Sequence, residues 1–231
     1  MVFPCKINAQ HSSKGMLSID FSHYVDNVVL NLDSTVYKNK LGQSFTISNF
    51  KYYISNIHLV KADGKEFISP GYFLIDEDEK DSKKIILNAI PDGEYTSINF
   101  IVGVDSLHNC SGAQSGALDP ANAMFWAWNS GYIFLKLEGR SSFSKLPGNI
   151  FEYHIGGYKS PSNCIRTITL NFERPLQIEN NKTAELNIKV NAAEVLKAPT
   201  DIDFLKLPSV TDSHNAATIA NNYKDMFSVQ K

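Results

Sequence analysis

Short segments of alternating apolar and polar residues recur along almost the whole chain and limit the folds that it can adopt. In Met16–Tyr24, apolar side chains and His23 take every second position, which is the period of a β-strand. Turn signals separate such segments, and the strongest is the Asp63-Gly64 pair of a β-hairpin. This spacing predicts an all-β fold, an antiparallel, immunoglobulin-like β-sandwich with long loops. The expected strands are Met16–Tyr24, Val28–Leu32, Thr35–Tyr37, Ser44–Val60, Glu66–Ile75, Lys84–Leu87, Tyr95–Val104, Tyr132–Leu137, Phe151–Tyr158, Ile165–Phe172 and Ala184–Val195.

Three further expectations concern how these segments are arranged. Ser44–Val60 is predicted to form two strands, with a bend near Ser48-Asn49 or Ser55-Asn56. The last two strands of the series are predicted to pair antiparallel with each other. Ser213–Phe227 has apolar residues at helical spacing and predicts a short C-terminal helix.

The composition is that of an ordinary globular protein. The chain has 231 residues, of which 43% are hydrophobic and 20% charged, so it can bury a sizeable core. The chain has no internal repeat and no clear linker, so residues 11–231 are expected to form a single domain. The protein is also expected to be a monomer. The net charge of -2 gives no sign of binding to nucleic acid or to an anionic membrane. No apolar run approaches the roughly 20 residues needed to span a bilayer.

The first ten residues, MVFPCKINAQ, are expected to be the remnant of an export signal, because Ala9 suits the position before signal-peptidase cleavage. The basic part and most of the apolar part of such a signal are missing, so a short disordered N-terminus is the alternative. Export would place the protein in the periplasm, at the cell envelope or outside the cell. If Cys5 leaves with the signal, Cys110 and Cys164 remain as an expected disulfide, with two buried free thiols in a cytosolic protein as the alternative.

The stretch Ala117–Gly139 holds both tryptophans of the chain, Trp126 and Trp128. If this stretch is extended, the two indole rings point to the same side, because side chains alternate across a strand. Two interpretations remain open at this point. The rings either belong to the core of the sandwich or form part of a site that uses an indole.

The usual signatures of catalysis are missing, and the protein is expected not to be an enzyme. The sequence has no GxSxG, HExxH or P-loop motif. Asp105, Ser106 and His108 have the residue types of a hydrolase triad but lie too close together along one loop. Asp119 and Glu138 could form a glycosidase pair, but nothing in the sequence fixes their separation.

A metal site is the stronger alternative. A Cys110–Cys164 bridge would bring His108, His154 and the tryptophan stretch to one end of the sandwich. His23 could join them if its strand ends there. Imidazoles with a soft or aromatic neighbour suit copper better than the hard metals that prefer oxygen ligands.

Several segments resemble the MbnP-like family of bacterial periplasmic copper-binding proteins, which is associated in some genomes with methanobactin production. The resemblance rests on GVDSLHNCSGAQSGALDPANAMFWAWNSGYIFLKLEG and FEYHIGGY, and it extends to FSHYVDN, FKYYISNIHLVKADG and IANNYKDMFSV. It implies an exported β-sandwich. Some relatives accompany a dihaem peroxidase-like enzyme that oxidises a tryptophan to kynurenine, which then helps histidines to bind copper. The matching positions are Trp126, Trp128, Gly131, Tyr132, His154 and, in close relatives, His23.

The sequence therefore favours an exported copper-binding protein that holds Cu(I) or Cu(II). The expected metal ligands are His23, His154 and His108, and the expected aromatic contacts are Trp126, Trp128 and Tyr132. The alternative is a surface module that stacks the same three aromatic rings, exposed, on a carbohydrate or a protein without any metal. Convergence of histidine nitrogens beside the tryptophans would favour the first hypothesis.

Overall fold

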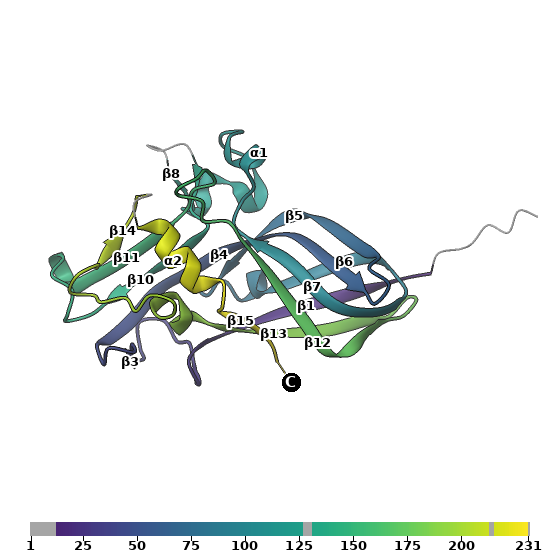
Figure 1. The fold of residues 1–231 in the computed structure, drawn as a ribbon, viewed down its shortest axis with the longest axis horizontal. Coiled ribbons are helices and arrows are strands. Elements are labelled where there is room, and N and C mark those ends of the chain that lie inside the picture. The colour runs from purple at the N-terminus through teal and green to yellow at the C-terminus, as the bar shows by residue number, and fades with distance from the viewer. Residues whose placement is uncertain (1–12, 127–130, 213–214, 231) are drawn as a thin grey trace, which may run out of the picture.

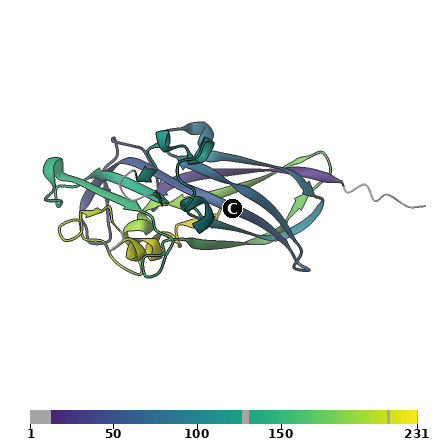
Figure 2. The same ribbon diagram turned by 90° about the horizontal axis from the view of Figure 1, so that it is seen from above.

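Two β-sheets pack face to face in a computed structural model that describes residues 13–126, 131–212 and 215–230. The strands run along the long axis of the molecule (Figure 1), and the view from above shows the same elongated shape (Figure 2). One sheet has five strands, β1 (Lys14–Val25), β2 (Val28–Val29), β6 (Lys84–Pro91), β13 (Thr183–Asn191) and β15 (Phe227–Val229). The other has eight, β3 (Tyr37–Lys38), β4 (Ser44–Lys61), β5 (Glu66–Asp76), β7 (Gly93–Val102), β10 (Leu135–Arg140), β11 (Ile150–Ile155), β12 (Arg166–Ile178) and β14 (Ser209–Val210). The predicted all-β sandwich is confirmed.

The remaining elements are short. β8 (Phe125–Trp126) and β9 (Gly131–Tyr132) form a separate two-stranded sheet. The α-helices are α1 (Ser106–Asn109) and α2 (Ala216–Tyr223). The 3-10 helices are η1 (Lys80–Lys83), η2 (Gly116–Leu118), η3 (Pro120–Asn122), η4 (Pro147–Asn149) and η5 (Ala192–Leu196). In the part of the chain that the structure describes, no helix has both the length and the apolar character to cross a membrane.

β4 is the centre of the larger sheet. It pairs with β5 along one side and with β10 and then β7 along the other. It is one continuous strand, so the prediction of two strands is wrong. Both expected bends are instead bulges, since the register shifts at Ser48 opposite β10 and at Asn56 opposite β5.

β12 and β13 do not pair with each other, which corrects the predicted antiparallel pair. β12 pairs with β7 in the larger sheet, whereas β13 pairs with β1, in parallel, in the smaller sheet. The turn between them therefore crosses from one sheet to the other. Alternation shows which face of a strand is buried, and both strands bury a face against the same core from opposite sides.

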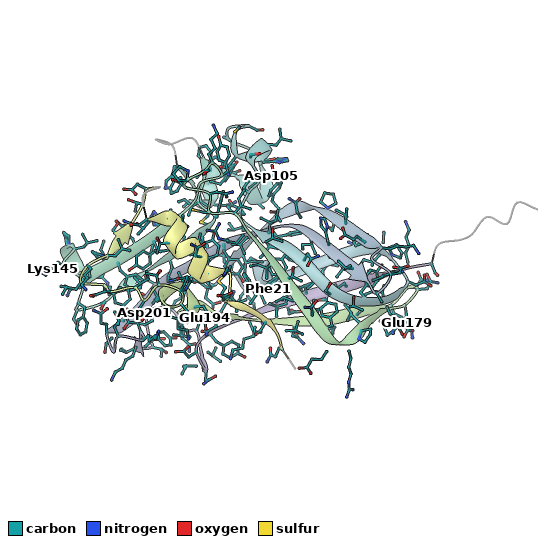
Figure 3. The ribbon with its side chains drawn as sticks, viewed as in Figure 1. Phe21, Asp105, Lys145, Glu179, Glu194 and Asp201 are labelled. Carbon is teal, nitrogen blue, oxygen red and sulfur yellow. The ribbon has the colours of Figure 1, made fainter. Side chains whose placement is uncertain are left out.

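The core lies between the sheets. Leu17, Ile19 and Phe21 of β1 and Phe50 and Tyr52 of β4 are all buried, and the Phe21 and Tyr52 rings lie edge to face with centroids 6.4 Å apart; Figure 3 shows Phe21 at the centre of the molecule. The predicted C-terminal helix is present but shorter than expected. It ends at Tyr223, and Phe227 begins the strand β15.

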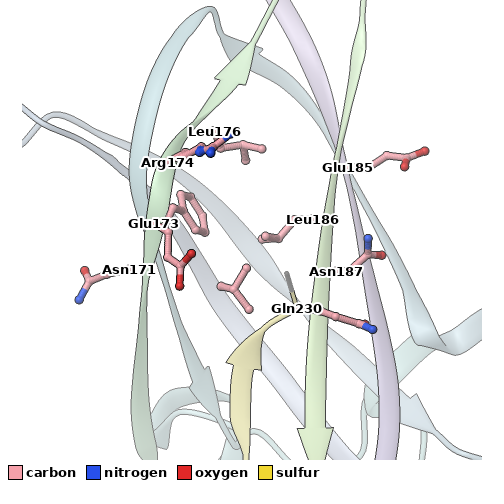
Figure 4. A pocket seen from close by; sticks show the side chains of 10 residues that line it. Asn171, Glu173, Arg174, Leu176, Glu185, Leu186, Asn187 and Gln230 are labelled. Carbon is pink, nitrogen blue, oxygen red and sulfur yellow. The ribbon is translucent and has the colours of Figure 1, made fainter.

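A groove of about 530 Å³ opens where the edge strand β12 lies beside β13 and β15 (Figure 4). Its apolar lining comes from Phe172, Leu176, Leu186 and Val229, and polar side chains surround it. None of the candidate site residues lines this groove.

Residues 105–126, which we call the cover segment, lie over the outer face of the larger sheet, at the top of Figure 1. The Tyr53 hydroxyl donates to the carbonyl oxygen of Ala117 (2.9 Å), and the Lys136 ammonium donates to that of Ala123 (2.5 Å). Tyr52 and Tyr53 point to opposite faces of β4, and both are fully buried. At this point the larger sheet is thus covered on both faces, by the smaller sheet and by the cover segment.

Candidate metal-binding region

His154 lies on β11, on the outer face of the larger sheet. Its Nε2 atom is 2.6 Å from a carboxylate oxygen of Glu138 on β10. This hydrogen bond lowers the pKa of Glu138, so the carboxylate is ionised and Nε2 must supply the proton. In the neutral form of the ring the lone pair is then on Nδ1, for which the described residues supply no hydrogen-bond donor. A carboxylate that fixes the far nitrogen of a histidine is the usual support of a metal-binding imidazole.

A row of charged side chains crosses four strands beside this histidine. Asp76, Lys51, Lys136 and His154 occupy directly paired positions on β5, β4, β10 and β11. Lys51 and Asp76 form an ion pair at 2.6 Å. Lys136 is buried under the cover segment, and burial lowers its pKa. The outer face of the sheet is therefore polar where the cover segment meets it.

Trp126 comes next to this row at the end of the cover segment. The indole fills the space beside Gly156, two residues beyond His154. A Cβ atom at Gly156 would lie 2.8 Å from the indole Cζ3 atom. Only 7% of Trp126 is exposed. The Trp126 ring thus packs on Gly156, two residues beyond His154, and a shared site of Trp126 and His154 stays a prediction. Trp128 lies outside the described residues.

Tyr132 is fully buried rather than exposed. Its hydroxyl donates to the carbonyl oxygen of Leu118 (2.8 Å), and its ring packs against Tyr53 and Phe125. Neither Tyr132 nor Trp126 is therefore available to stack on a carbohydrate or a protein surface. The alternative function that needs these rings exposed is contradicted for both.

His108 lies on α1, at the other end of the cover segment. Its Nδ1 atom is 2.6 Å from the Tyr72 hydroxyl and 3.2 and 3.3 Å from the two carboxylate oxygens of Asp105. The Tyr72 hydroxyl also donates to Asp105, and burial raises the pKa of Tyr72. Asp105 caps α1 by accepting from the His108 amide (3.1 Å). Figure 3 shows Asp105 at the top of the molecule beside this helix.

His23 belongs to the core instead. Its Nδ1 is 2.5 Å from a Glu77 carboxylate oxygen, and its Nε2 is 2.8 Å from the Tyr52 hydroxyl. Burial lowers the pKa of His23, so the ring is neutral, with Nδ1 donating to Glu77 and Nε2 accepting from Tyr52. No lone pair remains for a metal. The reason is strand alternation, since Tyr52 points into the core toward His23, whereas Lys51, the residue before it, lies on the outer face and pairs with Asp76.

The two described cysteines are free thiols, which corrects the predicted disulfide. Cys110 is exposed, and its thiol donates to the Tyr158 hydroxyl (3.0 Å). Cys164 is buried, which raises its pKa to about 12, and its amide donates to the carbonyl oxygen of Gly157. Both cysteines therefore contact the loop that follows β11. The two loops are neighbours as predicted, but no covalent bond joins them.

Nowhere in the described ranges do three or more His, Cys, Asp or Glu side chains converge as a metal cluster would. The cover segment contains His108 and contacts Lys136 and Gly156, the neighbours of His154, whereas His23 lies on the core face of the sandwich. Sequence reasoning missed the roles of Lys136 and Tyr72. The alternating LKLE of β10 does place Lys136 and Glu138 on one face, but Tyr72 is 33 residues from Asp105 and gives no local signal.

Comparison with known proteins finds similarity both in sequence, to a protein family, and in fold, to a solved structure. A sequence model of the MbnP family matches residues 14–216. In three dimensions the chain is similar to MbnP from Methylosinus trichosporium, with a TM-score of 0.58 and 13% sequence identity, over 82% of this chain and 80% of that one. At this identity the likeness concerns the fold. A search of curated proteins finds no match.

Proposed function

This chain belongs to the MbnP family, and from that premise we propose that it is an exported copper-binding protein and not an enzyme. Membership of this family suggests a methanobactin-associated, copper-related role. The observation that carries the proposal is His154, held by Glu138 through Nε2, with the Trp126 ring packed on Gly156 two residues further along the chain. Imidazole is a good ligand for copper, and the carboxylate fixes its orientation. His23 is left out of the proposed site.

One imidazole alone does not make a tight copper site, so the tryptophans enter the proposal. A neutral indole offers a metal only an N–H group and no lone pair. Oxidation of Trp126 or Trp128 to kynurenine would supply an aromatic amine and a ketone, groups that can bind a metal together with His154. We assign that modification to a dihaem peroxidase-like partner enzyme and propose the periplasm or cell envelope as the location of both proteins, a proposal supported by the family resemblance and by the sequence of residues 1–10.

The first experiment compares Cu(I) affinity by competition with a chromophoric chelator. His154→Ala should weaken Cu(I) binding at least about tenfold, and Glu138→Gln should weaken it by a similar factor through loss of orientation. His58→Ala is the matched control, because His58 also pairs with a carboxylate, Glu66 at 2.9 Å, but at the far end of β4. Equal effects of His154→Ala and His58→Ala would show that copper binding is adventitious.

The second experiment concerns the tryptophans. Protein from its own cell and protein from a foreign host without the partner enzyme are compared by peptide mass mapping and copper titration. We expect kynurenine and tighter copper binding in the first, and two intact tryptophans in the second. Intact tryptophans together with tight copper binding in the native protein would show that the proposed modification does not occur in this protein. Negligible copper binding by the proteins from both sources would contradict the proposed copper-binding function.

A further inference from the structure

We propose that Tyr72, Asp105 and His108 form a second metal site, separate from His154, for a borderline divalent ion such as Cu(II). A strand and a short helix supply the donors, since Tyr72 lies on β5 and the other two lie at α1. The phenol oxygen, a carboxylate oxygen and the imidazole Nδ1 meet at one point. Each of the three atoms lies within 3.3 Å of the other two.

One spacing in this cluster already fits an ion between the donor atoms, and the two spacings to the Tyr72 oxygen must widen. Ligand atoms at about 2.0–2.2 Å from an ion, at angles between square and tetrahedral, lie about 2.8–3.6 Å apart. The contacts of His108 with Asp105, at 3.2 and 3.3 Å, are already in this range. The contact of Tyr72 with His108, at 2.6 Å, and the shorter one with Asp105 must open as the phenol oxygen moves outward.

The cluster is both fixed in place and open to solvent. The Tyr72 ring packs on the His108 ring, with centroids 4.7 Å apart. Asn109 anchors the helix, because its side chain donates to the carbonyl oxygen of Val104 and accepts from the amide of Tyr132, both at 2.9 Å. The side chains of His108 and Asp105 are nevertheless 38% and 30% exposed. An ion can therefore reach the donors without unfolding of the cover segment.

The chemistry of the donor set selects the kind of ion. On binding, the Tyr72 phenol releases its proton to solvent, and the ion takes a phenolate oxygen, a carboxylate oxygen and the imidazole Nδ1. The proton of the neutral imidazole is then on Nε2. Two anionic oxygens balance a divalent charge, and a mixed nitrogen and oxygen set suits Cu(II) better than Cu(I). The site thus differs in preference from the His154 region and does not depend on the function proposed for that region.

The test is a titration of the full chain with Cu(II), followed by visible absorption and electron paramagnetic resonance. A phenolate bound to Cu(II) gives a ligand-to-metal charge-transfer band, which we expect in the wild type and in His154→Ala. Tyr72→Phe keeps the ring packing and should abolish the band. Tyr24→Phe, on β1, is the matched control and should keep it. Asp105→Asn and His108→Ala should each weaken Cu(II) binding at least about tenfold.

The failures of the two proposals are distinguishable. Absence of the band in the wild type, or its persistence in Tyr72→Phe, would overturn the second site whatever the Cu(I) result. Loss of thermal stability in these variants without any Cu(II) binding by the wild type would show that the cluster only anchors α1, and would overturn the site as well. Loss of Cu(II) binding in His154→Ala would show one shared site and would also overturn it.

Discussion

At the scale of single residues, the same side chain takes different roles because its surroundings differ. His23 and His154 each contact a carboxylate at 2.5 and 2.6 Å. His23 has a second partner in Tyr52 and is sealed between the sheets, whereas His154 stays partly exposed beside the cover segment. A histidine with both nitrogens engaged stabilises the core, and one with a remaining lone pair can bind a ligand.

The buried His23 predicts that stability depends on pH. The unfolded chain protonates this histidine at a pKa of about 6.5, whereas the folded chain resists protonation because burial lowers the pKa. Burial alone would raise the pKa of Glu77, but its hydrogen bonds from His23 and Lys83 outweigh burial and lower it. Both groups therefore make the unfolded state bind more protons as the pH falls, so the free energy of unfolding should decrease below about pH 6.5.

Urea unfolding between pH 5 and pH 8, a range on both sides of about 6.5, measures this dependence. His23→Gln should lose about 2 kcal/mol at pH 7, because it weakens the hydrogen bonds of a buried, partly charged cluster. It should also flatten the pH profile above pH 5. His58→Gln, with its side chain 31% exposed, is the control and should leave the profile unchanged. A wild-type profile that is flat between pH 7 and pH 5 would contradict the prediction.

At the scale of elements, local pattern predicted the strands, but partners distant in the sequence decided their roles. Alternation correctly placed His23 on the apolar face of β1, but Tyr52 and Glu77, which engage its nitrogens, lie 29 and 54 residues away. The expected bends of β4 were correctly located but are bulges within one strand.

The sheet that β13 joins was not predictable, because its apolar face fits either side of the core. A disulfide was expected to bring the tryptophan stretch toward His154, but the described cysteines are free, and the contact that the structure does show is that of the Trp126 ring with Gly156.

The contact of the Trp126 ring with Gly156 predicts that one added methyl group at Gly156 will displace the indole. In Gly156→Ala, the new Cβ would lie 2.3 Å from the carbonyl oxygen of Tyr132 and 2.8 Å from the Trp126 ring, so the indole must move. We expect a shift of tryptophan emission toward that of a more hydrated ring, and weaker Cu(I) binding. Gly139→Ala is the matched control, because its Cβ would lie 1.9 Å from the carbonyl oxygen of Thr46, away from the tryptophans.

Each substitution should cost about 1–3 kcal/mol through overpacking. Under native conditions the emission of Gly139→Ala should nevertheless match that of the wild type, because the new Cβ meets the Thr46 carbonyl oxygen and the Phe151 ring and not Trp126. Fluorescence spectra and urea unfolding of both variants separate the two effects. Identical emission from Gly156→Ala and the wild type would mean that Trp126 does not depend on the space at Gly156.

At the scale of the whole molecule, the sandwich is closed by its C-terminal residues. The groove between β12 and the β13–β15 edge leaves one side of the core less covered (Figure 4). β15 lies along this edge, where it pairs with β13 in the smaller sheet. Its Phe227 ring crosses to the other sheet and packs edge-on against Phe100 and Tyr52, at centroid distances of 5.0 and 5.7 Å. A strand of three residues thus joins the two sheets through one side chain.

This contact predicts a large effect of a change close to the end of the chain. Phe227→Ala should lower the free energy of unfolding by about 3–5 kcal/mol, because it removes a buried ring and leaves a cavity between the sheets. Phe143→Ala is the matched control. Its ring is 42% exposed, so its loss should change stability by less than about 0.5 kcal/mol. Urea unfolding at pH 7 compares the two variants.

Because Phe227 packs on Tyr52, which in turn donates to His23, Phe227→Ala should also weaken the pH dependence of stability. If Phe227→Ala were no more destabilising than Phe143→Ala, the smaller sheet would be held to the larger one without β15, and the C-terminal strand would only line the groove.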